Sequence, residues 1–167
     1  MAARNVTKDN ITTYLFNLFD LNKEEICVAW VRYLKDHPDA TIGTKYIVYR
    51  NLQPQLPKTP ALEVVPRNKS NEIRMMATQE DTFNFDIIVS VTSNHPQKAG
   101  KFLDIVADAI ELYLNDFQRR NFEIPDLSGM CAYFSQAGPT EYGFRRGQGL
   151  LSARIPWYCK VFKPERY

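Results

Sequence analysis

The sequence has few of the residues from which metal sites, disulfide frameworks and common catalytic centres are built. Its 167 residues include only three cysteines and two histidines. Cys27, Cys131 and Cys159 are far apart, form no CxxC pair and have no histidine cluster nearby. Their spacing therefore predicts neither a disulfide framework nor a structural zinc site. Because each cysteine lies in an apolar run, we expect small buried hydrophobic residues rather than metal or cofactor ligands.

The chain also lacks a strong charge of either sign and a long hydrophobic run. Its 21 basic and 19 acidic residues leave a formal net charge of +2, which is too small to predict electrostatic capture of nucleic acid. The longest apolar run is far shorter than the roughly 20 residues that span a bilayer. The first ten residues, MAARNVTKDN, lack the apolar region of a signal peptide. We expect no membrane association and a protein that stays in the compartment where it is made.

Motifs of known catalytic chemistry are missing as well. His37 and His95 each precede a proline at a predicted helix boundary, with no acidic residue or cysteine at a ligand-type spacing. There is no GxSxG elbow, no GxxxxGK[ST] loop and no HExxH helix. We therefore predict that the chain is not an enzyme and assign no catalytic residue.

One glycine-rich segment leaves an enzymatic alternative open. In GFRRGQG at 143–149, glycines could let the backbone approach an anion that Arg145 and Arg146 would neutralise. Loops between strands, however, use glycine for turn geometry, and arginine is enriched at protein interfaces. The segment fits a contact surface better than a phosphate site, and a small nucleotide- or phosphate-binding enzyme stays as the remote alternative.

The residues that are present predict a single domain over 1–167, since 44% hydrophobic content in a chain of this length is enough for one core. The first half begins with helical spacing of apolar residues from Thr7 or Asp9 to about Asp20, and again from Asn22 to the His37-Pro38 step. A strand is predicted at 45–50. The proline-rich stretch 51–71 excludes a helix and allows only an edge strand near 61–65.

The second half carries the stronger patterns. A weak strand is expected at 71–78, and strict alternation predicts a central strand at 82–92. A cap at 93–96 precedes a long amphipathic helix of about 22 residues. Strands follow near 130–136 and 150–162, separated by a loop at 137–149, and Pro156 requires an edge or a bulge. The fold class is α+β: an antiparallel or mixed sheet with the long amphipathic helix packed on one face and two N-terminal helices.

Aromatic residues suggest a surface that becomes buried on assembly. Nine tyrosines and two tryptophans occur in the chain, and six of the tyrosines lie outside the predicted helices. Tyrosine and tryptophan combine apolar area with a polar group, which favours them at interfaces, although sheet positions also use them.

Several of these segments, in this order, resemble the tail-terminator, or tail-completion, proteins of long-tailed bacteriophages. The resemblance covers roughly residues 45–163: PALEVVP, the strand FNFDIIVSV, a polar cap, the helix KAGKFLDIVADAIELYL and the late strand LLSARIPWYCKVF. The two helices expected before Lys45 are longer than in the smallest members.

The resemblance implies a small structural subunit of the virion neck or tail, assembled in the host cytoplasm. It implies a homo-oligomeric ring, commonly a hexamer, that stops growth of the tail tube. The ring would contact the tube protein, the tail sheath if the tail has one, and neck or connector proteins. DNA would pass through the lumen without sequence-specific binding. Another neck or tail-adaptor ring protein is the alternative.

Head-to-tail rings need two different complementary patches on each subunit. We expect these patches in 51–71 and 137–149 and on the flanking strands. The candidate interface residues are Tyr49, Arg50, Leu52, Leu56, Tyr142, Phe144, Arg145 and Arg146.

Overall fold

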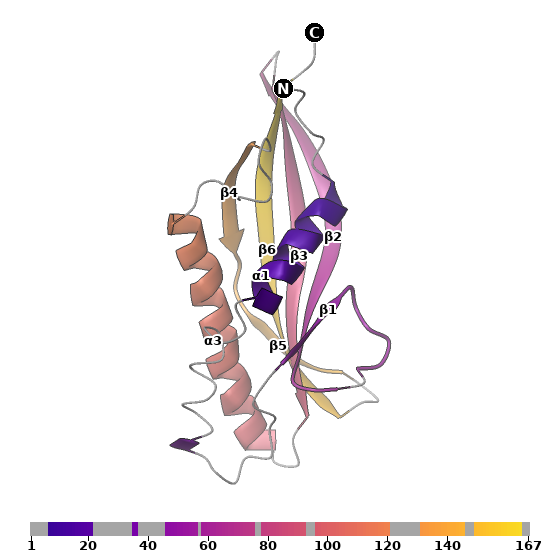
Figure 1. Ribbon diagram of the computed structural model, residues 1–167, viewed down its shortest axis with the longest axis vertical. Coiled ribbons are helices and arrows are strands. Elements are labelled where there is room, and N and C mark those ends of the chain that lie inside the picture. Colours follow the sequence, from indigo (N-terminus) through magenta and orange to yellow (C-terminus); the bar gives the residue numbers. More distant parts are fainter. Residues whose placement is uncertain are drawn as a thin grey trace.

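The protein is α+β and contains one mixed sheet, as the sequence predicts at that level. The computed structural model describes residues 7–21, 35–36, 46–56, 58–75, 78–92, 96–120, 131–145 and 149–164. Their helices and strands are α1 (Lys8–Leu21), β1 (Ile47–Arg50), β2 (Ala61–Met75), β3 (Thr78–Thr92), α3 (Pro96–Arg120), β4 (Cys131–Ala137), β5 (Glu141–Arg145) and β6 (Leu150–Pro164). Figure 1 shows long strands along the longest axis of the molecule.

The six strands follow the order β1-β2-β3-β6-β4, and β5 pairs with β6 next to β4. The β1 and β2 strands are parallel, whereas all other neighbouring strands are antiparallel. Each of β2, β3 and β6 has 15 residues, which corresponds to a sheet about 50 Å long.

Both helices pack on the same face of the sheet. The odd-numbered residues of β3 from Phe83 to Val91 alternate onto this face and are buried in one hydrophobic cluster with residues of α1 and α3. The α1 helix packs on β1 and β2, and α3 packs on β6, β4 and β3 (Figure 1). We call the opposite side the open face, because no helix of the described residues covers it.

The α3 helix contributes a continuous stripe of buried side chains to this cluster. The stripe recurs at helical spacing, while Asp104, Asp108 and Leu112 are exposed. Its members are Ala99, Phe102, Leu103, Val106, Ala107, Ile110 and Leu114.

The first helix begins at a cap that the sequence partly specifies. Of the two predicted candidates, Thr7 is the cap: its Oγ1 accepts a hydrogen bond from Asn10 N at 3.2 Å. Asn10 Oδ1 in turn accepts one from Thr7 N at 3.1 Å, as in a reciprocal capping arrangement. The helix is tied to the sheet where Tyr46 Oη donates to the Phe19 carbonyl at 2.8 Å. The predicted second N-terminal helix lies outside the described residues, apart from the helical pair at 35–36.

Two strand predictions need correction. The sequence predicts separate strands at 61–65 and 71–78, but β2 runs unbroken from Ala61 to Met75. A register shift between Pro66 and Lys69 absorbs the polar stretch that looks irregular in the sequence. The predicted loop 137–149 contains β5, which the Gly143 and charged residues of that segment conceal.

Pro156 lies in the interior of β6, where its missing backbone N–H leaves one position without a donor for hydrogen bonds between strands. Gly138 N donates to the Pro156 carbonyl at 2.6 Å, so the backbone groups of Pro156 face the β4 side and not β3. On that side the strand is interrupted at 138–140, between β4 and β5. The pairing of β6 with β3 continues without a shift through Asp86 and Pro156.

Candidate functional site

The open face carries a row of charged side chains from four neighbouring strands. Arg67 comes from β2, Asp86 from β3, Arg154 from β6 and Glu141 from β5. Strand pairing brings them together, because Asp86 is opposite Pro156 and Glu141 is opposite Arg154. We call these four residues the charge row.

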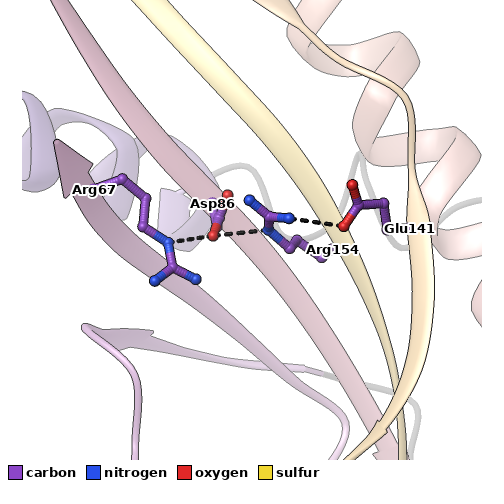
Figure 2. A network of polar contacts seen from close by, with 4 residues as sticks. All are labelled: Arg67, Asp86, Glu141 and Arg154. Carbon is purple, nitrogen blue, oxygen red and sulfur yellow. Dashed lines mark hydrogen bonds and ion pairs between the residues drawn. The ribbon is translucent and has the colours of Figure 1, made fainter. Parts of the chain in front are cut away.

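The side chains of the charge row alternate in sign and are directly bonded (Figure 2). Arg67 Nε donates to Asp86 Oδ2, and Arg154 Nε forms an ion pair with the same oxygen at 2.8 Å. Arg154 Nη1 then donates to Glu141 Oε2 at 2.7 Å. Two guanidinium groups and two carboxylates give the row no net charge.

Burial decreases from the middle of the row towards its ends. The Asp86 side chain is 2% exposed, while those of Arg67 and Glu141 are 46% and 60% exposed. A carboxylate this deeply buried is costly unless it is paired and hydrogen-bonded. The hydrogen bond with Asp86 raises the pKa of Arg154, against the effect of burial, and Glu141 adds to the increase. The two arginines thus hold Asp86, and both ends remain open to solvent.

The charge row can stabilise the sheet and bind a charged partner, but its arginines are not suited to proton transfer. Arginine stays protonated in proteins and cannot serve as a general base. Among the described residues, no group of three histidine, cysteine, aspartate or glutamate side chains could hold a metal ion. The arrangement therefore offers charged hydrogen-bonding groups but no activated nucleophile.

Two further ion pairs lie nearer the β2–β3 turn. Lys69 Nζ is 2.7 Å from Asp81 Oδ2 and lies over the Phe83 ring. Lys160 Nζ is 2.9 Å from Glu80 Oε1. Both carboxylates are fully buried, so these two acidic side chains are also held in ion pairs.

Four of the predicted interface residues lie at the β1 edge. Tyr49 and Leu56 are half-buried, whereas Leu52 is 51% exposed. Arg50 is exposed but ordered: its Nη2 donates to Thr13 Oγ1 at 3.0 Å, and its guanidinium lies 5.2 Å from the centre of the Phe16 ring.

The crossover from β1 to β2, residues 51–60, is anchored to the sheet by a buried carboxylate. Gln53 N donates to Glu63 Oε1 at 2.7 Å, and Glu63 is fully buried. Asn51 adopts a left-handed conformation with φ of 64° at the start of the crossover, a conformation that asparagine tolerates better than most residues. The anchor holds the chain near the exposed Leu52.

Three of the other four predicted residues lie at the opposite edge, on β5. Tyr142 is 54% exposed, and its pKa is raised to about 12 by burial, by a hydrogen bond with Asp104 and by the negative charges of Asp104, Asp108 and Glu111. Phe144 and Arg145 belong to β5, and Arg146 lies outside the described residues. The structure therefore does not gather the predicted set into one site but divides it between the two edges of the sheet.

The charge row is the feature that sequence patterns miss. Asp86 looks like an ordinary polar position in the alternation of β3, and Arg67 lies in a stretch predicted to be irregular. Only the strand register, which single-sequence patterns do not provide, brings the four residues together.

Comparison with known proteins adds no assignment. No protein-family model matches the chain, and a search of curated proteins finds no significant match. None of the helices in the described ranges is long and apolar enough to cross a membrane.

Proposed function

We propose that this chain is a structural ring subunit of a long-tailed phage, a tail terminator at the head-proximal end of the tail. The ring stops growth of the tail tube and joins the tail to the neck, and it has no catalytic role. The subunit carries the long amphipathic helix on one sheet face and the two N-terminal helices that the sequence predicts. The observation that carries the proposal is a sheet with two unlike edges, which no further strand of the described residues covers along β2 from Val65 or along β4 and β5.

The first edge consists of β1 and the outer side of β2. Pairing with β1 ends at Val64, where Asn51 N donates to the Val64 carbonyl. From Val65 to Met75 no other strand of the described residues pairs with the outer side of β2. A strand edge of this kind exposes N–H and C=O groups that a further strand can bind.

The second edge consists of β4 and β5, and the direction of β4 allows antiparallel pairing with the first edge. The β2, β3, β6 and β4 strands alternate in direction, so β4 runs opposite to β2. When β4 of one copy lies beside β2 of the next, the antiparallel order continues across the boundary. Such a contact joins two different surfaces, as a closed head-to-tail ring requires.

The dimensions of this assembly suit passage of DNA. At the level of β4 each copy contributes four strands across the sheet, β2, β3, β6 and β4. Six copies with strands about 4.8 Å apart then give a circumference of about 115 Å and a backbone diameter of about 37 Å. Strand tilt widens the ring further. With α1 and α3 outside, the open face lines the lumen, and its paired charges offer no excess of positive charge to retain a duplex.

The partners follow from the position of the ring. We propose that one rim contacts the tail tube, and the sheath if the tail has one, and that the other contacts neck or connector proteins. DNA passes through without sequence-specific binding.

The deciding experiment is electron microscopy of particles assembled without this protein. Loss of a terminator is expected to give tubes of variable and excessive length that carry no head, and restoring the protein is expected to correct both defects. Tubes of normal length that fail to join heads would instead assign the chain to a neck or tail-adaptor ring. Normal virions would refute a structural role.

A further inference from the structure

The charge row ends in opposite signs at opposite edges of the sheet. Arg67 is its positive end, on the outer strand β2, and Glu141 is its negative end, on β5. Both side chains are about half exposed, at 46% and 60%. A neighbouring copy can therefore reach either end without disturbing the buried Asp86.

Both ends also have hydrogen-bonding capacity left. Arg67 uses its Nε for Asp86, and none of the described residues is seen to bond its two terminal nitrogens. Glu141 uses Oε2 for Arg154, and its other oxygen has no partner among the described residues. Paired arginine and carboxylate groups form the strongest hydrogen bonds available to side chains.

The two ends are offset along the strands. Arg67 lies between Pro66 and Lys69, which are opposite Phe85 and Phe83, whereas Glu141 is opposite Arg154, which in turn is opposite Ile88. The offset of three to four residues corresponds to about 12 Å along the strands. Copies that join side by side with this stagger bring the two ends together, as in a closed sheet whose strands are tilted.

We propose that Arg67 of each copy pairs with Glu141 of the next, so that the charge row continues around the ring as an unbroken belt of alternating charges. This inference rests on the proposed ring and names the contact that closes it. The occupant of each edge is a second copy of this chain, because the opposite edge of the same sheet supplies the complementary charge.

The belt also selects the head-to-tail arrangement. Two copies joined by the same edge place Arg67 beside Arg67, or Glu141 beside Glu141, in a two-fold dimer. Like charges in such a contact are unfavourable, whereas the unlike edges attract. The row therefore favours a closed ring over a two-fold pair.

Charge reversal with mixing tests the pair. In Arg67→Glu every contact becomes Glu–Glu, and in Glu141→Arg every contact becomes Arg–Arg. We expect each variant alone to need about tenfold more protein to form rings, as seen by sedimentation velocity. An equimolar mixture restores unlike contacts and is expected to form rings near the wild-type concentration.

Native mass spectrometry of the mixture supplies a second readout. Because only unlike copies attract at every contact, the rings are expected to contain equal numbers of the two variants. Lys101→Glu changes an exposed charge on α3 by the same amount as Arg67→Glu and is expected to leave ring formation unchanged. Circular dichroism verifies that each variant is folded; if a reversal prevents folding, Arg67→Gln and Glu141→Gln replace the reversals and are each expected to weaken ring formation several-fold.

The outcomes separate the contact from the ring itself. Wild-type rings that tolerate both reversals, or folded variants whose mixture stays dissociated, overturn the Arg67–Glu141 contact and leave the ring in place. Glutamine variants that assemble like the wild type would also overturn the Arg67–Glu141 contact and leave the ring in place. A wild-type chain that stays monomeric at every attainable concentration overturns the ring and this contact together.

Discussion

At the scale of single residues, the sheet depends on how its buried charges are paired. Asp86 is almost fully buried and forms ion pairs with two arginines through one oxygen. We predict that Asp86→Asn lowers the free energy of unfolding by about 2 kcal/mol, because it leaves two adjacent guanidinium groups without their shared carboxylate. Urea denaturation at neutral pH measures the change.

The matched control for this substitution is Glu141→Gln in the same row. Glu141 is 60% exposed, and exposed ion pairs contribute little, so we expect a loss within about 0.5 kcal/mol. Equal losses for the two variants would mean that burial does not set the importance of the row.

A second residue-scale prediction concerns the buried thiol of Cys159. Burial disfavours the thiolate and raises the pKa of Cys159 to about 12. In the native protein at pH 8 we expect iodoacetamide to leave Cys159 unmodified, and in urea we expect rapid labelling of the same peptide, both followed by mass spectrometry. Labelling at equal rates in the two states would contradict its burial.

The same shift has a consequence for alkaline stability. In the unfolded chain the thiol ionises at its ordinary pKa of 9.0, whereas the folded state keeps it protonated. The contribution of the buried, protonated thiol to the free energy of unfolding is fully present below pH 9 and is lost as the pH rises towards 12. Cys159 therefore adds to the fall in the free energy of unfolding over that range.

At the scale of elements, the β5–β6 hairpin depends on one left-handed glycine. Gly149 has φ of 61° directly before β6, a conformation that a side chain disfavours. We predict that Gly149→Ala destabilises the protein by about 1 kcal/mol in urea denaturation. Gly143→Ala, within β5 and with no atom near its added Cβ, is the control, and we expect it to be neutral or slightly stabilising.

The crossover between β1 and β2 gives a second prediction at this scale. Glu63 accepts a hydrogen bond from the Gln53 amide, so Glu63→Ala is expected to increase hydrogen exchange over 51–56 by at least about tenfold. Glu63→Gln keeps an accepting oxygen and is expected to retain most of the protection. Unchanged exchange in the alanine variant would show that other contacts hold the crossover.

The strands also show which parts of the fold can be predicted from sequence patterns and which cannot. In β3 apolar residues alternate with polar ones from Phe83 onwards because one face of the strand is buried. This alternation lies within the strand and can be recognised in its sequence. In β2 the polar residues after Pro66 lie on an outer strand with a bulge, where the hydrophobic pattern no longer applies. The charge row depends on the register of four strands, which arises only when the whole sheet forms.

At the scale of the whole molecule, the two groups of predicted interface residues are the two sides of one proposed subunit contact. They lie at opposite edges, and a head-to-tail assembly brings the β1 edge of one copy against the β5 edge of the next. The charge row crosses the sheet between these edges and ends in opposite signs. A chain with a net charge of only +2 can therefore still have strongly directional association, because direction depends on where the charges lie and not on their sum.

The exposed leucines provide the test of which surface becomes buried. Leu52 at the β1 edge is 51% exposed and Leu112 on α3 is 69% exposed. If the β1 edge is a subunit contact, Leu52→Glu is expected to raise the protein concentration needed for ring formation by about tenfold, since it places a charge in a desolvated interface. Leu112→Glu makes the same chemical change on the helix-covered side and is expected to have little effect. Sedimentation velocity compares the two variants, and a stronger effect of Leu112→Glu would move the subunit contact from the sheet edge to α3.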